Sequence, residues 1–297
     1  MISSNIGFIG LGEMGGPIAA NLARAGFAVT AFHRGGRDYE DLSSAGAVLT
    51  RNLDDLTGSK VLLTCLPDDE TVKGILFGDH GIAEKLSSGS LVIDLSTISY
   101  VAAIEIAKKL KKSNIDFLDA PISGMAARAK DGTLTVMCGG ETAAFERAKP
   151  CFSAFSNKVM YMGGSGSGQL TKLINQLLFD VNCAALAEIL PMSVKLGLDP
   201  AQVTEVVNSG TGRSYASEHF LPRILNGDFQ SGYPMKAAYK DLVHAAQISA
   251  QEQIPLPVVA AATAIYQQTL KRGHGDHDKG AMILLFEEIL GVQFRKS

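Results

Sequence analysis

The first half of the chain alternates between two patterns of hydrophobic and polar positions. Short apolar, β-branched runs predict strands, and longer stretches with apolar residues every three or four positions predict helices between them. Strands are expected at residues 6–9, 27–32, 61–66, 91–95, 116–118, 134–138 and 159–162. Helices are expected at residues 14–25, 101–112 and 142–152. This alternation predicts an α/β domain with a doubly wound, mostly parallel sheet that has helices on both faces.

The second half of the chain shows only the helical pattern. It begins at the flexible segment Gly163-Gly164-Ser165-Gly166-Ser167-Gly168, which is typical of a hinge or domain edge. Helices are expected at residues 169–196, 200–208, 214–225, 235–251, 256–271 and 279–290, the first with a kink at Pro191. The sequence therefore predicts an α/β domain over residues 1–163 and an all-α domain over residues 164–297.

Composition and charge narrow the classes of partner. The chain has 297 residues, of which 46% are hydrophobic and 19% are charged, so two domains with real cores are expected. The net charge of -3 gives no reason to expect nucleic acid or a membrane as a partner. Neither a signal peptide nor an apolar run of bilayer length is evident, which makes the cytoplasm the expected location. The four cysteines lack CxxC spacing and are interpreted as reduced core residues.

The strongest local motif is the glycine turn Gly10-Leu11-Gly12-Glu13-Met14-Gly15, which follows the first strand and opens the first helix. Gly10 permits a tight turn, Gly12 lets a pyrophosphate approach the backbone, and Gly15 lets the helix pack closely on the strand. The free N–H groups at the helix start favour an anion. The turn predicts a Rossmann domain that binds a dinucleotide; a glycine turn without a nucleotide is the alternative.

The end of the second strand bears on the choice of cofactor. An NAD site usually places a carboxylate here to bind the ribose 2′-hydroxyl, but this chain has His33. Arg34 and Arg37 follow, and arginines can bind a 2′-phosphate through charge-assisted hydrogen bonds. A solvated basic loop is the alternative, and Asp38 is still within reach of a ribose. NADP(H) is therefore the predicted cofactor, with NAD(H) as the second choice.

Further motifs follow in a fixed order along the chain. They are GFIGLGEMG near the start, Leu66-Pro67, DLST at 94–97, DAPISG at 119–124, DGTLTVMCGG at 131–140, GxxxK at 168–172 and KDL at 240–242. In this order and spacing the chain resembles, nearly end to end, the β-hydroxyacid dehydrogenase family. That family includes 3-hydroxyisobutyrate dehydrogenase, tartronate semialdehyde reductase, and glyoxylate and succinic semialdehyde reductases.

The resemblance implies that Lys172 is the catalytic acid/base. Reduction of a carbonyl needs a hydride on carbon and a proton on oxygen, and an ammonium group both stabilises the developing alkoxide and supplies the proton. Without the resemblance, a single lysine would be interpreted as a surface residue.

The resemblance also implies the other site residues. Ser123 and Gly124 would anchor the substrate carboxylate through a hydroxyl and backbone N–H groups. The predicted substrate-binding set is Ser123, Gly124, Met125, Asn175 and Gln176. Besides the glycine turn and the basic loop, the predicted cofactor-binding set includes Leu66, Pro67, Thr97 and Lys240. Ser123 as a plain turn residue and Lys240 on a solvated helix face are the alternatives.

Three positions depart from the family pattern. Met125 stands where many relatives have a second glycine, which narrows the anchor loop and adds an apolar wall. Gln176 replaces an asparagine that binds substrate in many members, as in the tartronate semialdehyde reductase-like branch. Tyr100 replaces a proline and is expected to change only a helix start. The segment from His274 to Asp278 is interpreted as a helix-entry loop, and no metal is expected.

The leading hypothesis is an NADP(H)-dependent oxidoreductase that interconverts a small carboxylated aldehyde and its hydroxyacid. A dehydrogenase of a longer, threonate-like sugar acid and a non-enzymatic dinucleotide-sensing module remain alternatives. Lys172 counts against an imine reductase, a group that generally lacks this lysine. A homodimer or homotetramer is expected.

Overall fold

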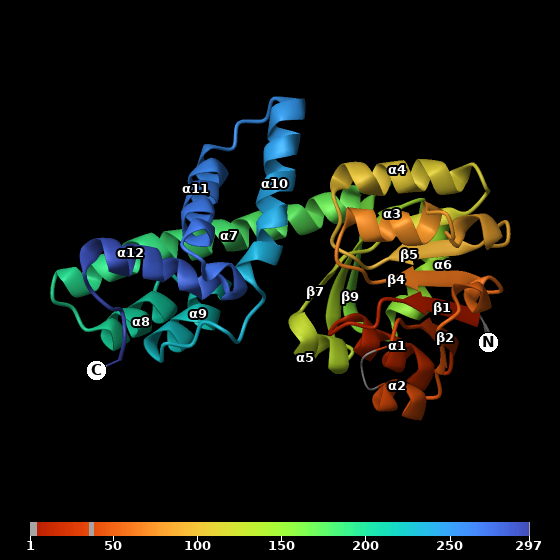
Figure 1. The fold of residues 1–297 in the computed structure, drawn as a ribbon, viewed down its shortest axis with the longest axis horizontal. Coiled ribbons are helices and arrows are strands. Elements are labelled where there is room, and N and C mark those ends of the chain that lie inside the picture. The colour runs from red at the N-terminus through yellow and green to blue at the C-terminus, as the bar shows by residue number, and fades with distance from the viewer. Residues whose placement is uncertain (1–4, 36–38, 297) are drawn as a thin grey trace. The chain divides into compact units, whose positions relative to one another are not determined.

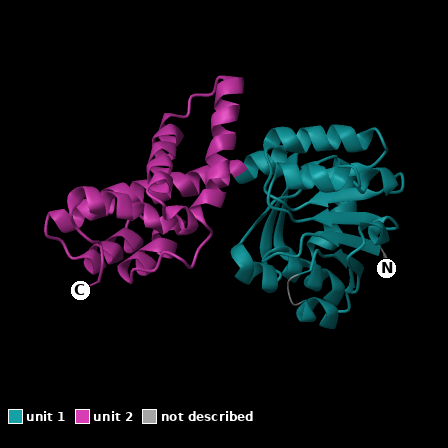
Figure 2. Cartoon of the chain, in the orientation of Figure 1, with its two compact units in different colours: residues 1–172 teal, residues 173–297 magenta. Residues whose placement is uncertain are grey.

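The computed structural model describes residues 5–35 and 39–296. It forms two compact units, residues 1–172 and 173–297, shown in teal and magenta in Figure 2. The division falls inside a long helix, α7 (Ser167–Lys195). The sequence predicts the domain boundary after Gly163, before this helix begins. That boundary stays a prediction.

The first unit is built on one sheet. Its strands are β1 (Asn5–Ile9), β2 (Ala28–Phe32), β3 (Val48–Thr50), β4 (Val61–Thr64), β5 (Leu91–Asp94), β6 (Asp116–Asp119), β7 (Ile122–Ser123), β8 (Leu134–Gly140) and β9 (Ser156–Gly163). The order is β3-β2-β1-β4-β5-β6-β8-β7, with β9 paired to β8. The six neighbouring strands β3, β2, β1, β4, β5 and β6 are parallel to one another. Strand β8 runs antiparallel to β6 and β7.

Helices cover both faces of this sheet (Figure 1). They are α1 (Gly15–Arg24), α2 (Glu40–Ser44), α3 (Asp69–Phe77), α4 (Tyr100–Lys111), α5 (Met125–Lys130) and α6 (Thr142–Phe152). Leu63 and Ile93 pack into the core that α1 and α6 share, whereas their neighbours Leu62 and Val92 pack into the core under α3 and α4. Side chains alternate between the faces of a sheet, so burial on both faces explains why these strands are apolar throughout.

The predicted fold class is confirmed, and each predicted strand and helix of the first unit is present. The prediction missed β3 and β7, which are only three and two residues long, and the helices α2, α3 and α5. The strands β3 and β7 and the helices α2 and α5 carry too few positions to display a period, whereas α3 has nine residues and its absence from the prediction has no such reason.

In the described residues of the second unit, all regular secondary structure is helical. Beyond α7 it contains α8 (Pro200–Ser209), α9 (Tyr215–Leu225), α10 (Met235–Glu252), α11 (Pro257–Lys271) and α12 (Ile283–Leu290), with short 3₁₀ turns at His274–Asp276 and Lys279–Met282. Its core is formed by residues such as Leu190, Phe220, Leu221, Tyr266 and Met282. The helices agree with the sequence prediction to within a few residues, except that residues 279–282 form a 3₁₀ turn before α12.

Helix α7 corrects one expectation. By length and composition it is apolar enough to cross a membrane, although no such run was expected from the sequence. The core helix of a globular domain passes the same test, and Cys183, Ala187 and Leu190 of α7 are buried in the core of the second unit. Cys138 and Cys151 are buried as well, Cys65 is half-buried, and all four thiols are free.

Candidate active site

The glycine turn after β1 has the geometry that a dinucleotide needs. Gly10 has a φ of 102°, and a Cβ built on it would lie 2.2 Å from the carbonyl oxygen of Cys65. A Cβ on Gly15 would lie 1.9 Å from the carbonyl oxygen of Gly10, so neither position accepts a side chain. Nothing lies within 4 Å of a Cβ built on Gly12, and Met14 supplies no side-chain cap to the N-terminus of α1. Open space beside uncapped helical N–H groups fits a pyrophosphate.

The basic loop after β2 is described only in part. The backbone N–H of His33 donates to the carbonyl oxygen of Thr50 at 3.0 Å, and its ring contacts Tyr39 edge-on at 4.9 Å between centroids. The His33 Nδ1 atom is buried without a hydrogen-bond partner among the described residues. Arg34 is exposed. Arg37 and Asp38 lie outside the described residues.

A buried carboxylate ties together the two loops that follow β4 and β5. Asp94 Oδ1 accepts hydrogen bonds from Thr64 Oγ1 at 2.7 Å and from Ser96 N and Oγ at 3.2 and 2.5 Å. Ser96 Oγ in turn accepts from the backbone N–H of Leu66 at 2.8 Å. Burial raises the pKa of Asp94 against the lowering effect of these hydrogen bonds. The network fixes the loops that carry Leu66, Pro67 and Thr97.

A second buried carboxylate holds the start of α7. Asp119, the last residue of β6, accepts from Gly166 N at 2.7 Å and from Gln169 N at 2.9 Å. The Gln169 amide donates to the carbonyl oxygen of Ser96 at 2.8 Å and accepts from Ile98 N at 3.2 Å. Burial raises the pKa of Asp119 to about 6. The first turn of α7 is thereby fixed to the carboxyl ends of β5 and β6.

Gly168 permits this close approach. A Cβ on Gly168 would lie 2.4 Å from the carbonyl oxygen of Asp119 and 2.5 Å from that of Met137, so the helix start lies directly against the sheet. Lys172 follows one turn later and is only 8% exposed. The sequence prediction assigned no role to Asp119 or Gln169. An acid that ends a strand, and a glutamine that follows a glycine-rich segment, are the signals that point to them.

The predicted substrate loop follows β7. Ser123 lies opposite Thr135 of β8. Gly124 has a φ of 143°, and a Cβ on it would lie 2.9 Å from the Cβ of Arg128. Met125 has a φ of 61°, in the left-handed region that favours glycine, and its side chain is 44% exposed. Met125 therefore has a backbone conformation that favours glycine, at the position where the family pattern predicts a glycine.

The predicted site residues are divided between the two units. Those of the first unit follow the carboxyl ends of β1, β2, β4, β5, β7 and β9, the last through Lys172 on α7. Asn175, Gln176 and Lys240 belong to the second unit. There the amide of Gln176 donates to Asp241 Oδ2 at 3.4 Å, and Lys240 is half-buried on α10. Asp241 is the acid of the KDL motif, although no role was predicted for it.

The loop from His274 to Asp278 has structural contacts of its own. The rings of His274 and His277 stack at 5.4 Å between centroids, and Asp276 pairs with Lys236. Asp278 accepts from Gly280 N at 2.9 Å, which caps the following 3₁₀ turn. Over residues 5–35 and 39–296, no group of three or more His, Cys, Asp or Glu residues is arranged to hold a metal.

Known proteins match the chain over almost its whole length. The family model for the NAD-binding domain of 6-phosphogluconate dehydrogenase matches residues 5–163. A second model, described as the NAD-binding region of NADP-dependent 3-hydroxyisobutyrate dehydrogenase, matches residues 166–286. Together these models cover both the α/β unit and most of the helical unit.

Individual relatives agree with the family models. The chain is 35% identical to 2-(hydroxymethyl)glutarate dehydrogenase of Eubacterium barkeri, over 98% of this chain and 97% of the relative. It is 33% identical to 2-hydroxy-3-oxopropionate reductase of Escherichia coli, over 95% and 97% of the two chains. A crystal structure of 3-hydroxyisobutyrate dehydrogenase from Salmonella typhimurium superposes with a TM-score of 0.86 at 31% identity, covering 95% of this chain and 100% of the other. The chain therefore belongs to the β-hydroxyacid dehydrogenase family and is an oxidoreductase that uses a nicotinamide dinucleotide.

Proposed function

We propose that this oxidoreductase prefers NADP(H) and interconverts a small carboxylated aldehyde and its hydroxyacid, with Lys172 as the acid/base. The observation that carries the proposal is the burial of Lys172 one turn beyond the anchored start of α7. Lysine is almost never fully buried unless it is paired, because removal of its charge from water is costly, so a buried lysine at this position supports the role that the family resemblance implies. The glycine turn and the basic loop after β2 support the choice of cofactor.

The proposed reaction needs one side chain that can both donate and accept a proton. A nicotinamide dinucleotide held at the glycine turn would supply the hydride for reduction and accept it in oxidation. Lys172 Nζ donates a proton to the carbonyl oxygen as the carbonyl carbon is reduced, and it takes the hydroxyl proton in the reverse direction. The contacts of Asp119 and Gln169 keep the first turn of α7 in place while the proton moves.

The substrate carboxylate is assigned to the loop after β7. Ser123 provides a hydroxyl, and the N–H groups around Gly124 provide further donors without a charged side chain. Met125 gives this loop a partly exposed apolar side chain, at the position where the family pattern predicts a glycine. The proposal therefore assigns the carboxylate to Ser123 and Gly124 and the discrimination of the substrate's tail to Met125, with Asn175 and Gln176 as further contacts.

The acid/base role is tested by Lys172→Ala. Turnover should fall about 100- to 10,000-fold, the usual contribution of a positioned acid/base group. The dissociation constant for the cofactor, measured by fluorescence titration, should stay nearly unchanged. Lys108→Ala, which removes an exposed lysine from α4, is the matched control and should keep full turnover. A normal kcat in the Lys172 variant would exclude the assignment.

The cofactor and substrate class are tested by a panel of semialdehydes, glyoxylate and 3-hydroxyacids, each assayed with both cofactors. We expect kcat/KM to be higher with NADPH than with NADH, because Arg34 and Arg37 are suited to a 2′-phosphate. A strong preference for NADH would exclude this reading of the loop. Turnover confined to threonate-like acids would favour the longer substrate, and no turnover on any member of the panel would exclude the proposed substrate class.

A further inference from the structure

Arg51, a cationic residue outside the basic loop, lies beside that loop. It directly follows β3, the strand that pairs with β2. Strands β2 and β3 are parallel, with Phe32 opposite Thr50, and His33 N donates to Thr50 O at 3.0 Å just past the end of β2. Arg51 directly follows Thr50. The carboxyl ends of β2 and β3 therefore place Arg51 next to the segment that contains His33 and Arg34.

The guanidinium of Arg51 lies over this segment. A Cβ built on Gly35 would be 2.9 Å from Arg51 Nη2 and 3.4 Å from Cζ, so the Arg51 side chain occupies the space in front of Gly35. Gly35 also has a φ of 90°, which side-chain-bearing residues rarely adopt. Arg34 and Arg51 are both exposed, and neither forms an ion pair with any of the described residues. Arg51 thus adds a positive charge to a segment that already contains the exposed Arg34.

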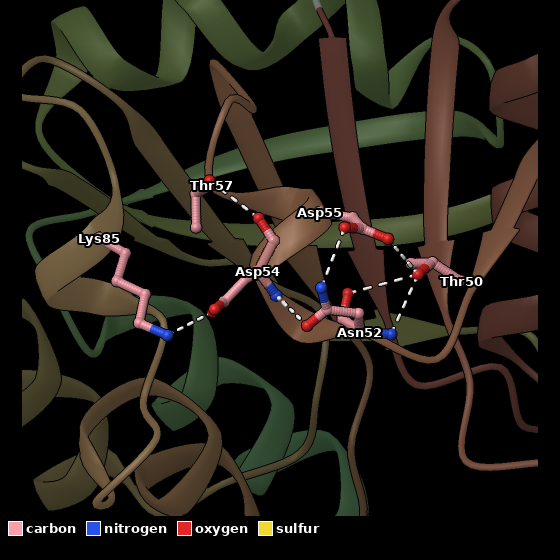
Figure 3. A network of polar contacts seen from close by, with 6 residues as sticks. All are labelled: Thr50, Asn52, Asp54, Asp55, Thr57 and Lys85. Atoms are coloured by element: carbon pink, nitrogen blue, oxygen red, sulfur yellow. Dashed lines mark hydrogen bonds and ion pairs between the residues drawn. The ribbon is translucent and has the colours of Figure 1, made fainter.

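The backbone on both sides of Arg51 is fixed by a polar network (Figure 3). Thr50 Oγ1 accepts from Asn52 N at 3.0 Å and donates to Asp55 Oδ2. The Asn52 side chain donates to Asp55 Oδ1 at 3.1 Å and accepts from Asp54 N at 3.2 Å. These contacts engage the Asp55 carboxylate, and Lys85 pairs with Asp54. Neither Asp54 nor Asp55 forms an ion pair with Arg51 in the described part of the chain.

We propose that Arg51 is a specificity-determining residue that binds the 2′-phosphate of NADP(H) together with Arg34. The adenosine ribose of a bound dinucleotide lies at the end of the second strand of a Rossmann sheet, which is where the Arg51 guanidinium lies against Gly35, the residue that follows the exposed Arg34. A guanidinium binds phosphate through two parallel N–H donors and is always charged. The inference rests on the proposed NADP(H) preference.

The test measures binding to the full chain with two fragments that differ only in the phosphate. Isothermal titration calorimetry with 2′,5′-ADP and 5′-AMP compares wild type with Arg51→Ala and Arg51→Lys. Arg51→Ala should weaken 2′,5′-ADP about tenfold or more, the usual effect of a lost charge-assisted hydrogen bond, and leave 5′-AMP unchanged. Arg51→Lys should restore part of the loss, because it keeps the charge but not the paired donors.

Lys60→Ala is the matched control. Lys60 is exposed and directly precedes β4, so it lies at the amino ends of the parallel strands, opposite the carboxyl ends where Arg51 lies. It should change neither affinity. If wild type prefers 2′,5′-ADP but Arg51→Ala weakens both fragments equally or neither, the role of Arg51 is excluded while the cofactor preference stands. If wild type binds the two fragments equally, the proposed NADP(H) preference fails, and the role of Arg51 fails with it.

Discussion

At the scale of single residues, Asp119 experiences opposing effects. Burial disfavours its charged form and raises its pKa to about 6, while the N–H groups of Gly166 and Gln169 favour that form. Burial has the larger effect, so the ionised carboxylate that caps α7 at neutral pH is held at a cost in stability. The same carboxylate fixes the start of α7, and with it the backbone position of Lys172.

This balance predicts an unusual pH dependence of stability. Because the pKa of folded Asp119 is about 6 and its ordinary value is 3.8, the folded state binds the proton more tightly between these pH values. The contribution of Asp119 to the free energy of unfolding should therefore rise as the pH falls from 7 to 5, by about 1 kcal/mol. Denaturant titrations of wild type and Asp119→Asn across this range measure it, since the variant lacks the titration. If the free energy of unfolding of wild type, minus that of Asp119→Asn, falls on acidification, the two N–H groups outweigh burial.

Other residue-scale features were partly visible in the sequence. The three glycines of the first turn were predicted from their spacing, and the structure supplies the reason for two of them, because a Cβ on Gly10 or Gly15 would collide with a backbone oxygen. Arg51 was not predicted, because its proximity to Gly35 depends on the pairing of β2 with β3. Gly168 appeared in the sequence only within a flexible segment and as the first residue of the GxxxK motif, without a structural role, yet it is the residue that lets α7 approach the sheet.

At the scale of elements, length decided what could be predicted. Long helices such as α4 and α10 repeat their apolar positions over several turns, and their predicted bounds agree with the structure to within a residue. The short strands β3 and β7 were missed because they form by pairing with a neighbour rather than by a pattern of their own. Both are adjacent to proposed binding residues, Arg51 and Gly124. The elements least visible in the sequence therefore border two of the sites.

At the scale of the whole molecule, α7 has an exposed apolar stripe. Ile174, Leu178, Ile189 and Met192 are each more than half exposed, and at 100° per residue they fall within about 60° of the helix circumference. A long apolar stripe on the surface of a helix is typical of an interface. We expect a second copy of this chain to cover it, consistent with the homo-oligomer predicted from the sequence.

The interface is tested by Leu178→Glu combined with Met192→Glu. The buried charges should disrupt association and lower the mass measured by light scattering toward that of one 31.4 kDa chain. Val101→Glu places the same charge on an exposed apolar residue of α4 and should leave the mass unchanged. A wild-type chain that is already monomeric at micromolar concentration, or a double variant with unchanged mass, would contradict the expectation.

The sequence by itself determined the fold class, the glycine turn, the family and the order of the motifs, because periodicity and local spacing are properties of neighbouring residues. The tertiary structure alone decided that Asp119 and Gln169 fix the start of α7, that Lys172 is buried there, and that Arg51 lies over Gly35. Each of these contacts or burials depends on residues far apart in the chain or on different strands. Their proximity follows from the parallel pairing of the strands, which brings the carboxyl ends to one edge of the sheet.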